Sequence, residues 1–335
     1  MREADIRPAG ILNEYLRLAA TDARLYFSDK AAMQPRACPG CGDDQPQPAF
    51  AKEGFDYVTC GACGSLYALA VPSPDRLADF YRDSPSQRYW AEVFYPSVAE
   101  ARRHKLVRPR VERIRQLAGT HGGVPETITD VGAGAGVFLE VCRAVGLGTR
   151  HRAVEPNVRM AEACRGLGFD TFEGFAADAA EDPDLADAND LVTSFEVIEH
   201  VADATAYLRG LARLVRPGGL IVVSGLCGDG FDIAVLGRHS KAVSPPHHLN
   251  FLSRRGVARL LGRCGLEEAA FLTPGALDVD IVRNTLLETP EAGVEPFLRR
   301  LVLDHEEDVR TAFQQFLADN RLSSHMWIVA RRPAA

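Results

Sequence analysis

The sequence lacks the features that mark several large classes of protein. It has no run of about 18 apolar residues, so a transmembrane helix of the usual length is excluded. Residues 1–10 are charged and lack the apolar stretch of a signal peptide, so we expect a cytoplasmic protein without a membrane partner. Repeats and low-complexity tracts are also lacking, and 46% hydrophobic residues indicate a chain that folds.

The sequence also lacks an excess of positive charge. Its 335 residues carry a net charge of −7, whereas a protein that binds nucleic acid needs clustered Lys and Arg side chains. This balance argues against a nucleic acid as partner. The length is sufficient for one large α/β domain with a smaller module.

Cysteine is present in a pattern that predicts a metal site. Four of the eight cysteines form two Cys-x-x-Cys pairs separated by 18 residues: Cys38, Cys41, Cys60 and Cys63. Four thiolates at this spacing are typical of a closed, structural zinc site, and Gly40 and Gly61 would permit the tight turns. The alternative is a pair of redox dithiols, but no thioredoxin-like helix start accompanies them. The other four cysteines are scattered, as small core residues would be.

Hydrophobic patterning indicates a parallel sheet in the second half of the chain. Expected strands alternate with helices: strands 127–131, 152–154, 170–172, 191–195 and 220–224, and helices 137–145, 158–167 and 204–214. This alternation favours a doubly wound sheet whose strands end at one edge. We also expect an amphipathic helix at 11–27, helices within 73–117, a helix at 297–303 and a last strand at 326–330.

A glycine loop lies between the first expected strand and helix. It reads Asp130-Val131-Gly132-Ala133-Gly134-Ala135-Gly136. Glycines at alternate positions allow a ligand to approach the backbone, and the helix N-terminus offers N–H groups to an anionic group. Glu155 follows the next strand, where a carboxylate can accept both hydroxyls of a ribose. The alternative is a glycine-rich turn of another nucleotide-binding α/β protein.

This loop resembles motif I of the class I methyltransferases that use S-adenosylmethionine (SAM). Three later segments, 194–201, 214–220 and 245–253, resemble motifs of the same family, and the resemblance covers residues 127–332. It implies that the loop holds the methionine part of SAM, Glu155 the ribose, and Phe175 with Ala176 the adenine. The implied cofactor residues are Asp130, Gly132, Ala133, Gly134, Gly136, Glu155, Phe175, Ala176, Phe195 and Glu196.

The resemblance also implies an overall organisation. The expected fold class is α/β, with a Rossmann-like class I methyltransferase sheet that is parallel except for a reversed last strand. A small N-terminal helix and a zinc-binding module would precede it. The expected segments are a helix in 1–36, the zinc module in 37–72, a helical lid or linker in 73–120 and the SAM-dependent domain in 121–335.

Three histidines are candidates for catalysis. Methyl transfer to an alcohol needs a general base, and His200, His247 and His248 lie near the expected strand ends. An alternative is that Glu196, Glu199, His200 and His248 bind Mg²⁺, which would polarise an acceptor hydroxyl. That set resembles the metal site of a small-RNA 2′-O-methyltransferase family and of ubiquinone-pathway O-methyltransferases.

The acceptor is predicted only by resemblance. Methyltransferases with an N-terminal zinc segment include bacterial enzymes for nucleotide-linked or surface-polysaccharide sugars, so we expect a small polar acceptor methylated on oxygen or carbon. Sugar C-methyltransferases carry a further α/β domain, which we do not expect here, and this weakens the expectation of C-methylation. The alternatives are an O-methyltransferase of a quinone or aromatic natural product, a zinc-containing RNA methyltransferase, and a catalytically silent binding protein. The oligomeric state is not predicted.

Overall fold

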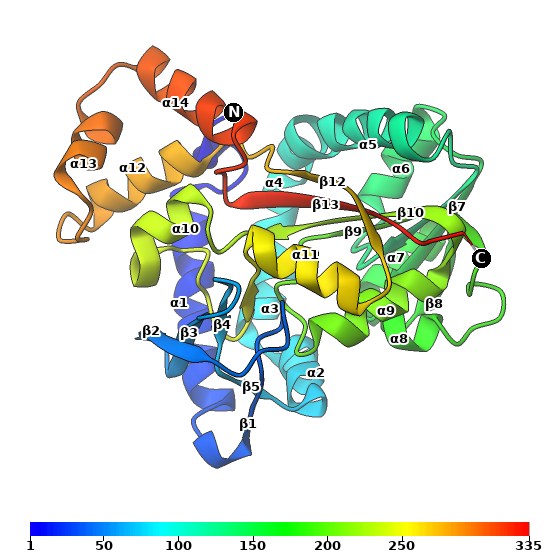
Figure 1. Cartoon of the computed structure of the whole chain (residues 1–335), viewed down its shortest axis with the longest axis horizontal. Helices are drawn as coiled ribbons and strands as arrows, with labels where there is room; N and C mark the ends of the chain where they lie inside the picture. The colour runs from blue at the N-terminus through cyan, green and yellow to red at the C-terminus, as the bar shows by residue number, and fades with distance from the viewer. Residues whose placement is uncertain (335) are drawn as a thin grey trace. The chain divides into compact units, whose positions relative to one another are not determined.

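The computed structural model describes residues 1–334 and divides the chain into two compact units (Figure 1). The sheet unit comprises Glu100–Gly225, Val257–Phe271 and the residues from Trp327 onward. The N-terminal unit comprises Met1–Ala99, Leu226–Gly256 and Leu272–Met326. Each unit is therefore assembled from separate stretches of chain. The expected division into four consecutive segments stays a prediction.

A seven-stranded sheet forms the centre of the sheet unit. Its strands are β6 (Thr127–Val131), β7 (Arg150–Glu155), β8 (Asp170–Glu173), β9 (Asn189–Phe195), β10 (Val215–Leu226), β12 (Glu267–Leu272) and β13 (His325–Arg331). Their order across the sheet is β12-β13-β10-β9-β6-β7-β8. The pairs β6–β7, β6–β9, β7–β8 and β9–β10 are parallel. The expectation of a mostly parallel α/β sheet is confirmed.

The last strand, β13, runs in the opposite direction to β10. The Gly218 amide donates to the Arg332 carbonyl at 2.9 Å, and the Arg332 amide donates to the Gly219 carbonyl at 3.1 Å. Such reciprocal bonds are the pattern of antiparallel neighbours. They also place the beginning of β10 beside the end of β13, as the expected reversed strand requires.

Helices cover both faces of this sheet. Their bounds are α5 (Arg108–His121), α6 (Val137–Ala144), α7 (Val158–Gly166), α8 (Ala176–Ala179), α9 (Ala204–Leu214) and α11 (Arg254–Arg263). In Figure 1, α5 and α6 lie on one face and α9 and α11 on the other. Local signals begin these helices: the Asp203 carboxylate accepts from the amides of Thr205 and Ala206 at the start of α9, and Asn157 caps α7.

The N-terminal unit contains the long helix α1 (Ala9–Tyr26), at the position that the amphipathic pattern predicts. A chain of helical segments follows the cysteines: α2 (Pro74–Asp83), α3 (Pro85–Tyr89), the π-helical η3 (Trp90–Phe94) and α4 (Tyr95–Arg102), before the π-helical η4 (Arg103–Val107). Leu12 of α1 packs with Phe94 and Val98 in a buried cluster. The burial of this apolar stripe gives the amphipathic helix its partner.

Small sheets and further helices complete the N-terminal unit. One sheet has the order β11 (Asn250–Phe251), β4 (Leu66–Ala68), β3 (Phe55–Cys60), β2 (Pro46–Lys52), and another pairs β1 (Met33–Pro35) with β5 (Ala70–Pro72). The remaining elements are η1 (Glu3–Asp5), η2 (Lys30–Ala32), α10 (Phe231–Leu236), η5 (Gly237–His239), α12 (Asp278–Glu288), α13 (Pro296–Leu303) and α14 (Glu307–Asp319).

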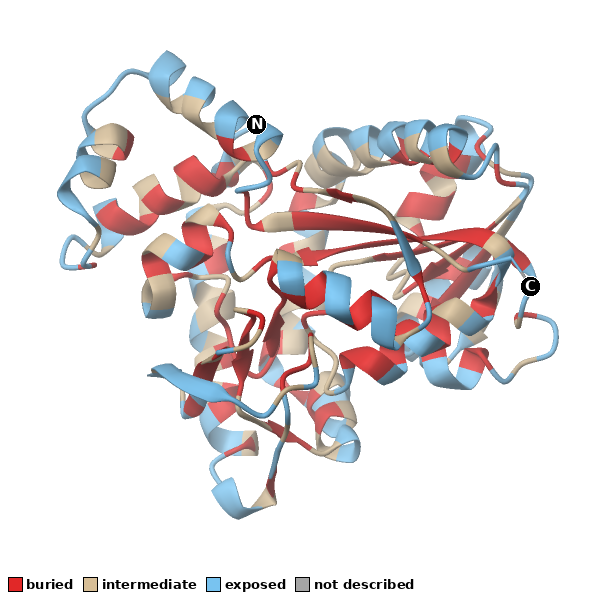
Figure 2. Ribbon diagram, viewed as in Figure 1, coloured by how far each residue is buried: buried red, intermediate tan, exposed pale blue. Residues whose placement is uncertain are grey.

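Burial follows the layers of each unit. Figure 2 shows the strands of the seven-stranded sheet mostly buried, while the helices around them expose one side. Val192, Leu191 and Ile128 in the central strands are at most 1% exposed. This burial on both faces explains why these strands appear in the sequence as continuous apolar runs. Within residues 1–334, no helix is both long enough and apolar enough to cross a bilayer.

Candidate cofactor and zinc sites

The glycine loop after β6 has a backbone that only glycine adopts easily. Gly132, Gly134 and Gly136 have φ angles of +74°, +53° and +76°. A Cβ atom on Gly132 would also lie 2.6 Å from Cγ2 of Val197, which is too close for two carbons. Ala133 lies between these glycines and is half-buried. At the C-terminal end of β6, the loop can therefore contact a ligand with its backbone atoms instead of with side chains.

Glu155 is held directly beside this loop. It ends β7 and is 7% exposed, and its carboxylate accepts from the Gly134 amide at 2.8 Å and the Asn157 amide at 2.9 Å. Burial raises the pKa of Glu155, while these two backbone hydrogen bonds oppose the rise. Each carboxylate oxygen keeps a second lone pair, so both oxygens can still accept from the hydroxyls of a diol.

Asp130 occupies a deeper position than the glycines. It is 3% exposed, and its carboxylate accepts from the Thr193 hydroxyl of β9 at 2.7 Å. Burial raises its pKa to about 7, against the opposing effects of Thr193 and the Arg110 guanidinium. The side chain thus joins β6 to β9 beneath the loop, so any contribution to cofactor binding passes through the loop backbone.

Phe175 and Ala176 follow β8 at the neighbouring strand end. The Gly174 amide donates to the Glu155 carbonyl at 3.2 Å, which ties this turn to β7. The side chain of Phe175 is 56% exposed although it is a large apolar group, whereas Ala176 is buried as the first residue of α8. An exposed aromatic face of this kind can stack against a purine ring.

Phe195 and Glu196 at the end of β9 meet an arginine that the sequence analysis missed. The Arg110 guanidinium lies 4.2 Å from the Phe195 ring centroid and 3.5 Å from the Glu196 carboxylate. Glu196 has a positive φ of 57° and accepts from the Ser224 hydroxyl at 2.5 Å. The Arg110 side chain is 16% exposed and lies among acidic groups, and such a guanidinium can pair with an anionic ligand group. No motif surrounds Arg110, so only its tertiary contacts reveal it.

Glu199 is a buried carboxyl group with one oxygen that lacks a hydrogen-bond partner among the described residues. It is 1% exposed, and the oxygen concerned is Oε2. Burial, and then the nearby Glu196 carboxylate, raise its pKa well above the ordinary value. His200 follows it and is half-buried. His248 belongs to the N-terminal unit, so the Mg²⁺ site expected from Glu196, Glu199, His200 and His248 stays a prediction.

His247 and His248 have different surroundings within the N-terminal unit. His247 is 1% exposed, and its ring lies 5.5 Å from Tyr15 and 5.0 Å from Phe80. Burial, and then His248, lower its pKa to about 3, so His247 is neutral. His248 is half-buried and its Nδ1 lies 2.5 Å from the Ala242 carbonyl, which requires Nδ1 to donate. Nε2 of His248 then carries the lone pair that a general base needs. The geometry favours His248, and both assignments stay predictions.

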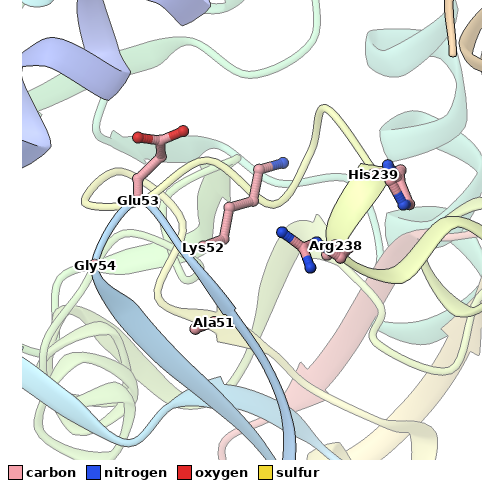
Figure 3. A pocket seen from close by; sticks show the side chains of 6 residues that line it. All are labelled: Ala51, Lys52, Glu53, Gly54, Arg238 and His239. Carbon is pink, nitrogen blue, oxygen red and sulfur yellow. The ribbon is translucent and has the colours of Figure 1, made fainter.

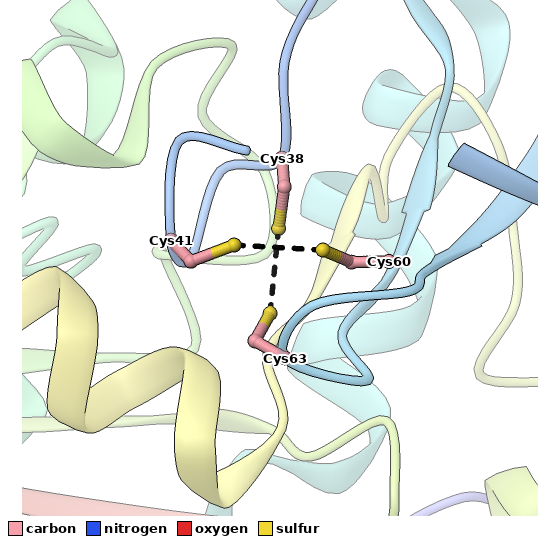
Figure 4. A group of neighbouring side chains, drawn as sticks. All are labelled: Cys38, Cys41, Cys60 and Cys63. Carbon is pink, nitrogen blue, oxygen red and sulfur yellow. Dashed lines mark hydrogen bonds between the residues drawn. The ribbon is translucent and has the colours of Figure 1, made fainter. Parts of the chain in front are cut away.

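The four module cysteines converge on one point (Figure 4). Their Sγ atoms all lie within 4.8 Å of one another, and the pairs Cys38–Cys63 and Cys41–Cys60 are each 3.5 Å apart. A zinc ion with Zn–S bonds of about 2.3 Å separates tetrahedral sulfurs by about 3.8 Å. A disulfide needs about 2.05 Å. The donor set therefore fits zinc.

The two knuckles have the same backbone turn, but different glycines make it. The Gly42 amide donates to the Cys38 carbonyl and the Gly64 amide to the Cys60 carbonyl, both at 2.8 Å, with φ angles of +78° and +85°. The expectation that Gly40 and Gly61 permit these turns is wrong, because neither residue has a positive φ. Gly40 is instead closely packed, since its Cβ would lie 3.0 Å from the Ser65 hydroxyl.

The chain is similar in sequence to known methyltransferases. A family model described as a methyltransferase domain matches residues 99–269, more than half of the chain. A ubiquinone biosynthesis O-methyltransferase of Methylocella silvestris is 31% identical over 251 residues, 70% of this chain and 86% of that protein. The same-named enzyme of Bradyrhizobium sp. (strain ORS 278) is 31% identical over 185 residues, 54% of this chain and 66% of its own length.

Solved structures show likenesses at lower identity. A SAM-dependent methyltransferase from Archaeoglobus fulgidus has a TM-score of 0.47 at 16% identity, with 71% of this chain and 99% of that chain covered. The chain spans about two thirds of the length of several of the curated relatives that it matches. On the family match and the Methylocella relative, this chain belongs to the methyltransferase domain family.

Proposed function

We propose that this chain transfers the methyl group of SAM to a hydroxyl oxygen of a small aromatic acceptor, such as a catechol of a quinone precursor. The observation that carries the cofactor half is Glu155, whose buried carboxylate is fixed by the Gly134 amide at the glycine loop. Support for an oxygen acceptor comes from the curated relatives, which are named ubiquinone biosynthesis O-methyltransferases.

Different residues of the sheet unit would bind different parts of SAM. The loop backbone from Gly132 to Gly136 would receive the methionine part, Glu155 the ribose hydroxyls and Phe175 the adenine. Arg110, the guanidinium beside Phe195 and Glu196, would also pair with the carboxylate of the methionine part. SAM, when bound, supplies an electrophilic methyl group, so the protein has to hold the two reacting atoms in line.

The acceptor must lose a proton as its oxygen forms the new bond. We assign this proton to Nε2 of His248, because the Nδ1 contact with the Ala242 carbonyl selects the required tautomer. Replacing His248 by Ala should lower kcat by about 100-fold or more, which is the usual contribution of a general base. Full turnover by both His248→Ala and His247→Ala would show that neither histidine is the base.

The sugar acceptor expected from the sequence receives less support than the aromatic one. It depends on the resemblance of the zinc module to sugar methyltransferases, whereas the relatives above carry the name of an O-methyltransferase of ubiquinone biosynthesis. Both readings require SAM, so the acceptor has to be separated by experiment. We also propose that zinc is bound by the four cysteines, at about one ion per chain.

A magnesium-assisted version of the reaction has one observation in its favour. The buried Oε2 atom of Glu199 lacks a partner in the part of the chain described, and Glu196 is close enough to raise its pKa. A divalent cation would pair both carboxylates and polarise the acceptor hydroxyl. Turnover that rises with Mg²⁺ in wild type but not in Glu199→Gln supports this version, and turnover indifferent to Mg²⁺ excludes it.

The test begins with calorimetry of the zinc-loaded chain titrated with SAM and S-adenosylhomocysteine. We expect micromolar binding that Glu155→Ala and Gly134→Val abolish, whereas Glu173→Gln, an exposed carboxylate paired with Arg165, should bind normally. Transfer of labelled methyl from SAM to catechols and to nucleotide sugars then separates the acceptors. Absence of SAM binding would overturn the proposal, and transfer to sugars alone would restore the sugar reading.

A further inference from the structure

A surface hollow of about 330 Å³ lies within the N-terminal unit (Figure 3). One wall is the end of β2 and its hairpin turn, with Lys52, Glu53 and Gly54, and the other wall is η5, with Arg238 and His239. Residues far apart in sequence thus bring two strong bases and a histidine to one cavity. None of them belongs to the cofactor or zinc sites described above.

The balance of charge in this hollow is positive, although the whole chain is acidic. Glu53 is the acidic lining residue, and its carboxylate pairs with the Arg24 guanidinium at 2.7 Å. Figure 3 shows the Glu53 carboxylate directed away from Lys52, whereas the Arg238 guanidinium is directed toward Lys52. Among the described residues, the Arg238 side chain makes neither a hydrogen bond nor an ion pair. Its charge is therefore compensated by solvent alone.

Lys52 is fixed in position at this cavity. Its Nζ donates to the Ser240 carbonyl at 2.8 Å, which leaves two ammonium hydrogens for other acceptors. Burial, together with the nearby Arg238, lowers the pKa of Lys52 to about 8, and Glu53 opposes this. Burial is the main cost to the Lys52 ammonium, and a bound anion would offset it by pairing with Lys52 and Arg238 together.

We propose that this hollow binds a small phosphate-bearing anion through Lys52, Arg238 and His239. The Arg238 fork can bind two phosphate oxygens, while Lys52 supplies a compact charge to a third. A volume of about 330 Å³ is at the small end of the range for ligand sites, so the cavity fits a diphosphate group rather than a large ligand. This site is independent of the proposed methyl transfer.

The first test is calorimetry of the full, zinc-loaded chain with inorganic pyrophosphate. We expect saturable binding that Arg238→Gln and Lys52→Gln each weaken by about tenfold or more, since each removes a charge-assisted contact. Arg300→Gln is the matched control, because it removes an exposed arginine of α13 in the same unit and should bind normally. ADP identifies the source: equal affinity indicates that only the phosphates are held, and tighter binding indicates a nucleotide.

A second measurement uses the wild-type chain, so it does not require a variant to fold. The chain has four lysines, Lys30, Lys52, Lys105 and Lys241, so their acylation is easily followed by mass spectrometry. Pyrophosphate should slow the acylation of Lys52 by about fivefold or more, because a paired ammonium is a poor nucleophile, while Lys105 reacts unchanged. Absence of pyrophosphate binding, or binding that leaves Lys52 labelling and the Arg238→Gln affinity unchanged, would overturn the proposal.

Discussion

Single buried charges set much of the chemistry of the sheet unit. Asp130, Glu155 and Glu199 are carboxyl groups at most 7% exposed, and burial raises the pKa of each. A cationic cofactor and the Arg110 guanidinium are the charges that can compensate them. The protein without a ligand therefore carries an electrostatic cost at the proposed cofactor site.

Asp130 should make the stability of the apo protein depend on pH. Its pKa is about 7 in the folded chain and about 3.8 when unfolded, so the folded state holds the proton that the unfolded state has lost. Its contribution to the free energy of unfolding is therefore unchanged below about pH 4, falls between about pH 4 and 7, and is constant above that range. Asp130→Asn removes this loss and retains an oxygen for Thr193.

The measurement is the unfolding free energy of wild type and Asp130→Asn between pH 4 and 8. The difference between them should shift by a few kcal/mol in favour of the variant as pH rises, at about 1.4 kcal/mol per pH unit at most. Asp184→Asn, at an exposed position, is the control and should show no trend. A pH-independent difference for Asp130→Asn would mean that its carboxyl group is ionised throughout.

The role of a single residue can be predicted from the sequence when the residues next to it in the chain define that role. Glu155 could be predicted because it follows a strand at a fixed distance from the glycine loop. Arg110 could not, because its burial against Phe195 depends on where a helix packs. His247 and His248 are equivalent in the sequence, and only aromatic packing around His247 separates a core residue from a candidate base.

At the scale of elements, the β6–α6 turn depends on Gly132 for two separable reasons. Gly132→Ala introduces a Cβ both at a positive φ and 2.6 Å from Val197. Gly146→Ala has a similar φ of +69° but no atom within 4 Å of the new Cβ, so it should lose only the conformational part, about 1 kcal/mol. We expect Gly132→Ala to lower the melting temperature further than Gly146→Ala and to weaken SAM binding.

The double variant Gly132→Ala/Val197→Ala separates these effects. Val197→Ala removes Cγ2, so in this background Gly132→Ala introduces only the backbone strain. We therefore expect Gly132→Ala to lower the melting temperature less in the Val197→Ala background than in wild type. Thermal melting of the four chains completes the cycle. If the alanine at 132 destabilises equally with and without Val197, the contact makes no contribution.

The zinc knuckles provide a second prediction at this scale. Gly64→Ala places a side chain at φ +85°, so we expect it to weaken zinc binding in competition with a chelator by about tenfold. Gly61→Ala has an ordinary φ, and its nearest neighbour is the flexible end of Gln47, so it should retain wild-type affinity. The opposite ranking would mean that zinc binding rearranges the second knuckle.

At the scale of the whole molecule, the sheet order decides which fragments can fold. The matched family segment, residues 99–269, ends before β13, which lies between β10 and β12. Without β13, the facing edges of β10 and β12 would be unpaired, and the sheet would lack core residues such as Ile328, which is 1% exposed in the full chain. We expect a fragment of residues 99–269 to lack a cooperative thermal transition, and a folded fragment with dispersed amide resonances would contradict this.

The sequence predicted the alternating elements of this sheet but not the discontinuity of the units. Strand and helix patterns are local, and the expected strand 127–131 and helix 204–214 coincide with β6 and α9. The edge strand β12 and the helices α10 to α12 went unpredicted. The grouping of Leu226–Gly256 and Leu272–Met326 with the N-terminus depends on contacts between distant parts of the chain, which periodicity does not encode.

The position of β13 also has a consequence for biosynthesis. A ribosome releases β10 and β12 well before Trp327, yet these two strands are separated in the finished sheet by the strand that is made after both of them. A nascent chain must therefore keep a gap between them, or let them pair wrongly and separate again. Correct folding of the sheet unit has to wait for translation of residues 325–331, and until then the two strand edges are natural targets for chaperones.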